Sequence, residues 1–270
     1  MRLIKLTVQK ILKSLGFEIY RTGPSSPRRT TPQIALQIAA QNGLQVNSVI
    51  DIGAAFGSWT TMCRGVFPNA NYVLIEPLAQ YDEWLHPLLS RFPNTTHIKA
   101  VVTDKVGQTP FFLHEDLMGS SLFPEAEGDN VNGTTIQVNS TTVDDIVAQQ
   151  KLVAPFLLKI DVQGAELQVL QGAISTLPQT EYVLVETSLF HFFKNGPLAH
   201  DLIAYMRQQG FVIYDIVGFQ YRLLDNALGQ VDLAFVSEHS PLRKEHVYAS
   251  AAQRLKQTQQ IKQNLTNNKQ

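Results

Sequence analysis

The 270-residue chain has a formal net charge of -1 at pH 7, a single cysteine, 44% hydrophobic residues and 17% charged residues. This composition is ordinary for a globular protein with a sizeable core, and it provides no basic field for binding nucleic acid. One cysteine also excludes a disulfide within the chain, which fits a reducing, cytoplasmic setting.

The first predicted element is an amphipathic basic helix over residues 2–16. Lysines interrupt its apolar positions, so we expect no secretory signal, and no apolar run in the sequence reaches the ~20 residues that span a bilayer. We expect the helix either to pack on its own domain or to lie on an anionic membrane face as a peripheral contact. A linker containing proline and glycine completes this region, residues 1–30, before a main domain predicted over residues 31–240.

A glycine turn follows the first predicted strand of this domain. The apolar run over residues 48–52 contains Asp51 and leads into Gly53 and Gly57. Glycine accepts positive φ and lets a ligand approach the bare backbone. The next apolar run ends in Glu76, whose carboxylate could accept both hydroxyls of a ribose. Together the two features predict a nucleoside-binding edge of a parallel sheet.

The glycine spacing indicates which nucleoside this turn could bind. A dinucleotide fingerprint has one residue between its first two glycines and then a third glycine, so that pyrophosphate sits on a helix N-terminus. Here three residues separate the two glycines, and Asp51 puts a negative charge where pyrophosphate would lie. The pattern therefore disfavours NAD and favours a ligand with cationic groups, such as S-adenosylmethionine (SAM). A strand-turn-helix that binds no ligand is the plain alternative.

Helices and strands then alternate along the chain as in a parallel α/β sheet. Helices are predicted over residues 33–41, 58–66, 79–91, 141–150, 162–176 and 198–209, and strands over residues 48–52, 71–76, 97–102, 156–161, 182–186, 211–217 and 231–236. We therefore expect a doubly wound, mostly parallel seven-stranded sheet that ends in an antiparallel pair joined by a loop over residues 218–230. A small β insertion is predicted over residues 107–140, between strands three and four, and a polar tail over residues 241–270.

The sequence resembles the FkbM-type family of class I SAM-dependent methyltransferases over roughly residues 46–237. The similarity rests on motifs in this order: D-I-G-A-A-F-G at 51–57, I-E-P at 75–77, A-V-V-T-D at 100–104, G-S-S-L at 119–122 and L-K-I-D-V-Q-G-A-E at 158–166. The chain departs from the family at Gln163, where relatives commonly have glutamate. The resemblance implies a Rossmann-like fold and an O-methyltransferase that acts on a hydroxyl of a sugar, glycolipid or secondary metabolite.

The resemblance also implies a set of residues that bind SAM. Asp51 would accept from the methionine ammonium or a bridging water, and Glu76 would hold the ribose. Asp104 would accept from the adenine amino group. The complete implied set is Asp51, Gly53, Ala54, Gly57, Glu76, Pro77 and Asp104.

Three residues are candidates for the base that takes the hydroxyl proton. His191 lies just beyond the fifth strand, and Asp161 and Glu186 end the fourth and fifth strands. In a second interpretation, Asp161 and Glu186 bind Mg²⁺, which lowers the pKa of the hydroxyl, and His191 is a packed residue among phenylalanines. Lys159, inside an apolar strand, needs a partner such as Asp161 or Glu186 unless it reaches solvent.

Two other functions remain open from the sequence. A SAM- or nucleoside-binding scaffold without turnover is compatible with Gln163, because an amide cannot act as a base. A dinucleotide oxidoreductase is disfavoured by the glycine spacing. For the acceptor itself, the polar insertion with its phenylalanines and histidine suits a hydroxylated small molecule or glycan.

Overall fold

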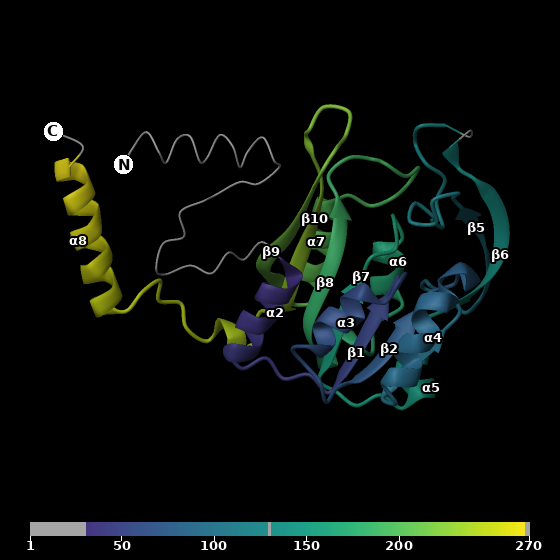
Figure 1. Cartoon of the computed structure of the whole chain (residues 1–270), viewed down its shortest axis with the longest axis horizontal. Coiled ribbons are helices and arrows are strands. Elements are labelled where there is room, and N and C mark those ends of the chain that lie inside the picture. Colours follow the sequence, from purple (N-terminus) through teal and green to yellow (C-terminus); the bar gives the residue numbers. More distant parts are fainter. Residues whose placement is uncertain (1–30, 129–130, 268–270) are drawn as a thin grey trace.

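The computed structural model describes residues 31–128 and 131–267, and it is built on a seven-stranded sheet (Figure 1). The predicted helix over residues 2–16 and its linker lie outside the described residues. The sheet order is β3-β2-β1-β7-β8-β10-β9. Its strands are β1 (Ser48–Ile52), β2 (Asn71–Ile75), β3 (Thr95–Ile98), β7 (Phe156–Ile160), β8 (Thr180–Ser188), β9 (Phe211–Tyr221) and β10 (Leu228–Ser237).

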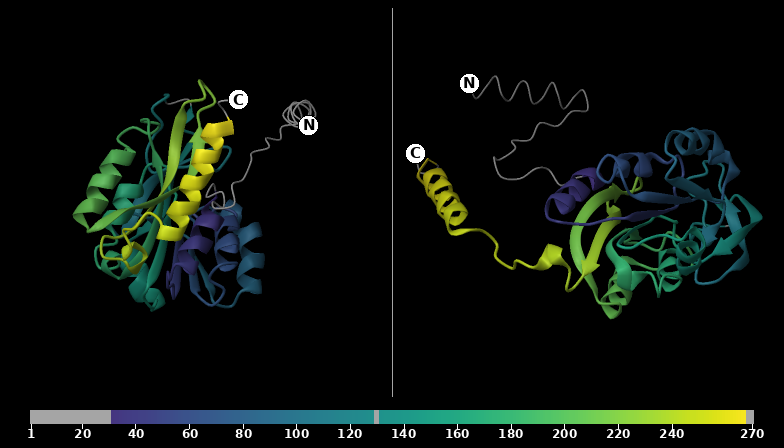
Figure 2. Two further views of the ribbon diagram at one scale, coloured as in Figure 1. Left: turned by 90° about the vertical axis from the view of Figure 1, so that its left-hand side faces the viewer. Right: turned by 90° about the horizontal axis from the view of Figure 1, so that it is seen from below.

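Strand β10 is antiparallel to β8 and β9, the other neighbouring strands of this sheet are parallel, and helices cover both faces (Figure 2). In β1, Val49 packs in one core, whereas Ile50 and Ile52 pack in the other. The first core contains residues of α2 (Pro32–Gln41), α3 (Ser58–Arg64) and α4 (Asp82–Arg91), and the second contains residues of α5 (Val143–Gln150), α6 (Glu166–Gln171) and α7 (Ala199–Gln208). Because both faces are covered, the central strands are mostly apolar, apart from Asp51 in β1 and Lys159 in β7. The predicted doubly wound α/β fold is confirmed.

The third predicted strand, over residues 97–102, is wrong in one respect. The chain bends after β3, where the Ala100 N–H donates to the Ile98 carbonyl, and residues Val101–Val102 form β4 in a different sheet. That small sheet has the order β4-β6-β5, with β5 (Gly107–Leu113) antiparallel to β6 (Thr134–Thr141). A continuous apolar run does not reveal that the backbone changes partners. The predicted β insertion is confirmed, and it lies between the third and fourth strands of the large sheet.

The loop predicted over residues 218–230 is also shorter in the structure. Strands β9 and β10 stay paired to Tyr221 and Leu228, through several register shifts, so only the turn over residues 222–227 joins them. The prediction was wrong because polar residues on this hairpin hide the strand pattern. Likewise, the helix predicted to residue 176 ends at Gln171, and the helix predicted over residues 79–91 begins with a 3₁₀ turn, Ala79–Tyr81.

The C-terminal helix α8 (Ala251–Asn267) stands apart from the sheet (Figures 1 and 2). Its described side chains are exposed, as expected for the polar residues of the predicted tail. Over the described ranges, no helix combines the length and the apolar character needed to cross a membrane.

The backbone after β1 passes close to the backbone after β7, at Gly53 and Asp161. A second glycine with nearly the same φ, Gly210, allows a test of this contact. Gly53 has φ +77°, and a Cβ there would lie 1.8 Å from the Asp161 carbonyl oxygen, whereas Gly210 has φ +80° and a Cβ there would meet nothing within 4 Å. We expect Gly210→Ala to lower the free energy of unfolding by about 1–2 kcal/mol, for the backbone alone. Gly53→Ala should cost about 1–3 kcal/mol more, because the strands must also separate. Urea denaturation measures both, and equal losses would contradict the contact.

Candidate active site

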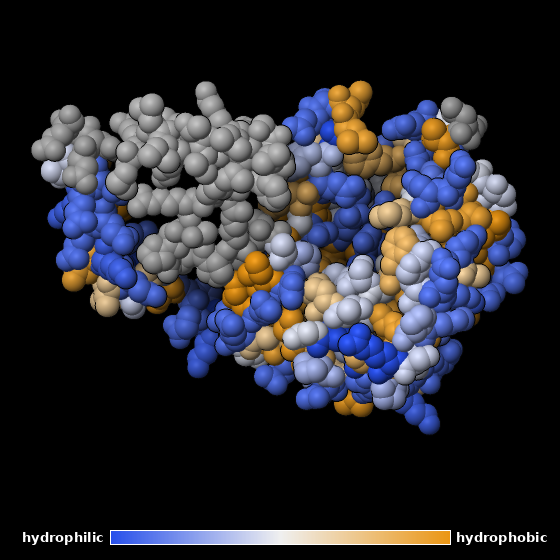
Figure 3. Space-filling model, in the orientation of Figure 1, coloured by the Kyte–Doolittle hydropathy of each residue, from blue (hydrophilic) through white to orange (hydrophobic). Residues whose placement is uncertain are grey.

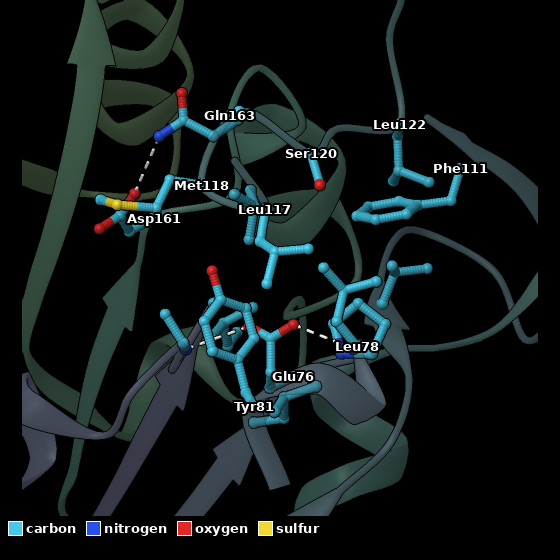
Figure 4. Close-up of a pocket in the computed structure, with 18 of the residues that line it drawn as sticks. Glu76, Leu78, Tyr81, Phe111, Leu117, Met118, Ser120, Leu122, Asp161 and Gln163 are labelled. Carbon is cyan, nitrogen blue, oxygen red and sulfur yellow. Dashed lines mark hydrogen bonds between the residues drawn. The ribbon is translucent and has the colours of Figure 1, made fainter. Parts of the chain in front are cut away.

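A cavity of about 370 Å³ opens at the carboxyl ends of β1, β2, β7 and β8 (Figure 4). Residues of the small sheet and its loop form one wall, and the β9–β10 hairpin contributes Gln220 and Gln230. This volume lies within the range of small-molecule sites, ~300–1,000 Å³. The carboxyl edge of an open α/β sheet is also where such folds bind their ligands.

Glu76 directs its carboxylate into the middle of the cavity (Figure 4). Its Oε2 accepts from the Ala55 N–H and its Oε1 from the Leu78 N–H, each at 3.0 Å. Burial raises the pKa of Glu76 to about 6, although both backbone donors act to lower it. Because each carboxylate oxygen can accept more than one hydrogen bond, both oxygens can still accept from two neighbouring hydroxyls.

The cavity differs in character between its two ends (Figure 4). On one side of Glu76, the apolar side chains of Leu78, Phe111 and Leu122 form a slot together with Val101 and Val102. On the other side lie the polar side chains of Asp161, Gln163 and Glu186, with Gln220 and Gln230. A ligand that fills the cavity would therefore have one apolar, flat or aliphatic part and one polar part.

Gln163 connects the two acids at the polar end. Its Nε2 donates to Asp161 Oδ1 at 3.3 Å and to Glu186 Oε2 at 3.1 Å, and Gln230 Nε2 donates to the same Oε2 at 2.8 Å. Burial, together with the charges of Asp161 and Asp232, raises the pKa of Glu186 to about 8. Gln163 has φ +54°, a conformation that non-glycine residues rarely adopt and that is often found at functional sites.

Gln163 therefore has a structural role in this chain. An ionised glutamate cannot donate a hydrogen bond, so it could not bridge Asp161 and Glu186 as the amide does. The sequence revealed the substitution but not the bridge, because the bridge depends on the backbone conformation at Gln163 and on a second strand.

A buried ion cluster lies beneath the glycine turn. Lys159 Nζ is 3.3 Å from Asp51 Oδ1 and 3.4 Å from Asp161 Oδ2, and it donates to the Gly53 carbonyl at 2.9 Å. Thr60 donates to Asp51 Oδ2 at 2.6 Å. Burial acts to lower the pKa of Lys159, but the charges of Asp161 and Asp51 have the larger effect together. The pKa of Lys159 is therefore above its usual range, and the amine is protonated. Of the partners predicted for Lys159, Asp161 is confirmed and Glu186 is replaced by Asp51.

Half of the predicted site residues line the cavity and half do not. Those that line it are Gly53, Glu76, Pro77, Asp161 and Glu186. The others, Asp51, Ala54, Gly57, Asp104 and His191, lie outside the lining. Residues that line the cavity and were missed by the sequence analysis include Ala55, Tyr81, Phe111, Gln220 and Gln230.

Each of the outlying residues has its own surroundings. Asp51 is fully buried in the ion cluster, and burial raises its pKa although Lys159 and Thr60 act to lower it. Gly57 begins α3, and a Cβ there would face Leu85 and Leu88 of α4 rather than the cavity. Ala54 is buried in the turn. Asp104 is paired with its neighbour Lys105, and His191 is exposed beyond β8.

Carboxylic acids line the cavity, without a basic side chain among its described lining residues. Glu76, Asp116, Asp161 and Glu186 are carboxylic acids, and none of the described lining residues is a lysine, arginine or histidine. This lining attracts cations and repels phosphates. The described ranges contain no group of three or more histidines, cysteines or acids placed to hold a metal ion, so the expected Mg²⁺ has no support.

The sheet, with its antiparallel strand β10 and an acid after β2 facing a cavity, has the Rossmann-like arrangement expected for a class I methyltransferase. Residues 51–213 match the family model described as the methyltransferase FkbM domain. The chain therefore belongs to the FkbM methyltransferase family, and the resemblance predicted from its motifs is confirmed.

Two solved structures illustrate the matches that a structural comparison finds. Methyltransferase FkbM from Methylobacillus flagellatus KT shares 17% identity, with 77% of this chain and 48% of that chain covered and a TM-score of 0.49. N-methyltransferase NodS from Bradyrhizobium japonicum WM9 shares 9% identity, with 78% and 94% covered and a TM-score of 0.43. The chain spans about half the length of the Methylobacillus protein. No curated protein matches the chain.

Removing the buried lysine tests the ion cluster. We expect Lys159→Met to lower the free energy of unfolding at pH 7 by about 3–5 kcal/mol, because Asp51 is left as a buried acid without its cation. The loss should shrink as the pH falls, since a buried acid with a raised pKa takes up a proton and stops opposing folding.

The matched control for that variant is Lys99→Met, which removes an exposed lysine paired with Asp82 on the surface. Surface pairs contribute about 0–1 kcal/mol, so this variant should unfold almost as the wild type does. Urea denaturation at several pH values measures both variants. Equal losses in the two would show that the buried cluster contributes no more than a surface pair.

Proposed function

We propose that the cavity binds SAM and that the enzyme transfers its methyl group to a hydroxyl oxygen of a sugar, glycolipid or secondary metabolite. The observation that carries this proposal is that the described lining around Glu76 contains carboxylic acids but no lysine, arginine or histidine. Methyl donors of this kind bear a positive sulfonium and ammonium, which such a lining stabilises, whereas the pyrophosphate of NAD would be repelled.

The two ends of the cavity fit the parts of SAM. Glu76 would accept from both ribose hydroxyls, since each of its oxygens already has one backbone donor and keeps room for another. The slot formed by Leu78, Phe111 and Leu122 suits the flat adenine ring. The methionine part would then extend past Gly53 toward Asp161.

Asp51 would act indirectly in this arrangement. Its carboxylate holds Lys159, and Lys159 holds the Gly53 carbonyl and Asp161. The role that we propose for Asp51 is therefore to fix the glycine turn rather than to touch the methionine ammonium. Asp104 and His191 have no contact with the cavity through which they could take the roles suggested by the sequence.

SAM supplies an electrophilic methyl group, which leaves the sulfonium sulfur as a bond forms to the acceptor oxygen. The chain has to hold the acceptor in line and remove its proton. Glu186 is our candidate for the base, because both amides that contact it bond to Oε2 and leave Oε1 available for the proton. Asp161, on the adjacent strand, is the second candidate.

Calorimetry with SAM tests the cofactor assignment. We expect the wild type to bind SAM and Glu76→Gln to bind it at least ~10-fold more weakly, because the amide NH₂ would face the Ala55 or Leu78 N–H and could no longer serve two hydroxyls. Glu83→Gln, the same substitution at an exposed position on α4, is the control. Absence of binding by the wild type, or equal binding by Glu76→Gln, would refute the site.

The pH dependence of methyl transfer tests the base. A base with a pKa of about 8 must be ionised to act, so kcat/KM should rise about tenfold per pH unit below pH 8 and level off above it. Glu186→Gln should lose ~10²–10⁴-fold in kcat together with this dependence, whereas His191→Ala should retain both. The assay follows labelled methyl transfer to monosaccharides and alkyl glycosides, with and without EDTA. Full turnover by Glu186→Gln would exclude this residue as the base.

Stability gives a second measurement at Glu186 that needs no acceptor. The folded-state pKa of about 8 lies above the ordinary value of 4.5, so the native state holds a proton that the unfolded state releases. The wild type should therefore lose stability as the pH rises through this interval. Glu186→Gln should lose less stability over this interval than the wild type, with the remaining loss coming from other buried acids with raised pKa values, such as Glu76.

A further inference from the structure

The hairpin of β9 and β10 ends in two leucines whose side chains are almost fully exposed. Leu223 is 105% exposed and Leu224 is 84% exposed. The hairpin extends beyond the carboxyl edge of the sheet, and its tip forms an apolar projection in the space-filling view (Figures 1 and 3). Lower on the same hairpin, Gln220 and Gln230 line the cavity, so one element connects the cavity to the apolar tip.

The turn does not require these leucines for its own structure. The Arg222 N–H donates to the Ala227 carbonyl at 2.8 Å, and the Asn226 N–H donates to the Arg222 carbonyl at 3.0 Å. Asp225 Oδ1 accepts from the Ala227 N–H at 3.0 Å, and Asn226 adopts φ +60°. Asp and Asn thus supply the turn chemistry. The side chains of the two leucines take no part in these hydrogen bonds and are exposed at the tip, where an apolar environment outside the chain would suit them.

The side chains next to the tip are of the types found at the interface between water and lipid. Tyr221 and Phe219 are 55% and 51% exposed on the stem of the hairpin. Arg222 lies over the ring of Phe190 at 4.3 Å from its centroid, and it pairs with Asp225 at 3.2 Å. Exposed aromatic rings next to an arginine with an apolar stem are typical of the interfacial layer between hydrocarbon and headgroups.

We propose that the tip of the β9–β10 hairpin, Leu223 and Leu224, inserts into the surface of a lipid bilayer. A second copy of the chain is a poorer occupant, because a projecting turn offers far less than the ~800 Å² per partner of a stable interface. The ion pair between Arg222 and Asp225 leaves the turn without net charge, which suits insertion into an apolar phase rather than attraction to a charged partner.

Insertion would orient the cavity toward the headgroups, since Gln220 and Gln230 lie between the tip and Glu186. An acceptor with a hydroxylated head on a lipid could then reach the polar end without leaving the membrane. This consequence for the acceptor rests on the proposed function, whereas the insertion itself does not.

Vesicle flotation of the full-length chain tests the insertion. With phosphatidylcholine vesicles in about 0.5 M salt, where exposed charges are screened, we expect the wild type to float with the lipid. Leu223→Ser/Leu224→Ser should lower the partition coefficient at least ~10-fold, because the apolar area that enters the lipid is lost. Its thermal unfolding and SAM calorimetry should match the wild type, since both leucines are exposed and neither lines the cavity.

The matched control is Val153→Ser/Ile174→Ser, which removes two exposed apolar side chains, 58% and 64% exposed, from the segments before β7 and after α6. This variant should float as the wild type does. Three results would overturn the proposal: no flotation of the wild type, equal flotation of both double variants, or binding only to anionic vesicles that salt abolishes. A shift from dimer to monomer in Leu223→Ser/Leu224→Ser would assign the tip to a second copy instead.

Discussion

The acidic edge of the sheet depends on one buried cation. Lys159 of β7 lies directly opposite Asp51 of β1 in the parallel register, and its amine also contacts Asp161 and the Gly53 carbonyl. A lone carboxylate or amine in this position would be too costly to bury, so the charges are stable only together. The cluster therefore joins the two central strands at the point where the glycine turn leaves the sheet.

Lys159 stabilises the acids without adding a positive charge to the lining of the cavity. Lys159 is 6% exposed and does not line the cavity, so its charge compensates the acids from beneath without offering a site to an anion. At the polar end, Gln163 donates to Asp161 and to Glu186, and Gln230 donates to Glu186, which the lysine does not contact. The buried Lys159 and the amides of Gln163 and Gln230 together stabilise several acids close to one another. These acids lie where we propose that a positively charged ligand binds.

Much of this arrangement was predictable from the sequence, for a physical reason. Strands β2, β7 and β8 are largely apolar runs with an acid at or near their carboxyl ends, and these ends share an edge of the sheet, so Glu76, Asp161 and Glu186 could be assigned to one site. The rest depends on contacts that local sequence does not encode. The N–H of Ala55 and the amide of Gln163 became relevant only through backbone conformation, and the polar hairpin concealed Gln230 within a predicted loop.

The two backbone donors to Glu76 come from different places, one from the turn after β1 and one from the residues after β2. A glutamate side chain in solution samples many rotamers, and ordering it on binding costs conformational entropy. Here that ordering takes place during folding, when the two strands pair. The receptor for the ligand's hydroxyls is thus preorganised, and the entropy of binding is left to the ligand and to the solvent that it displaces.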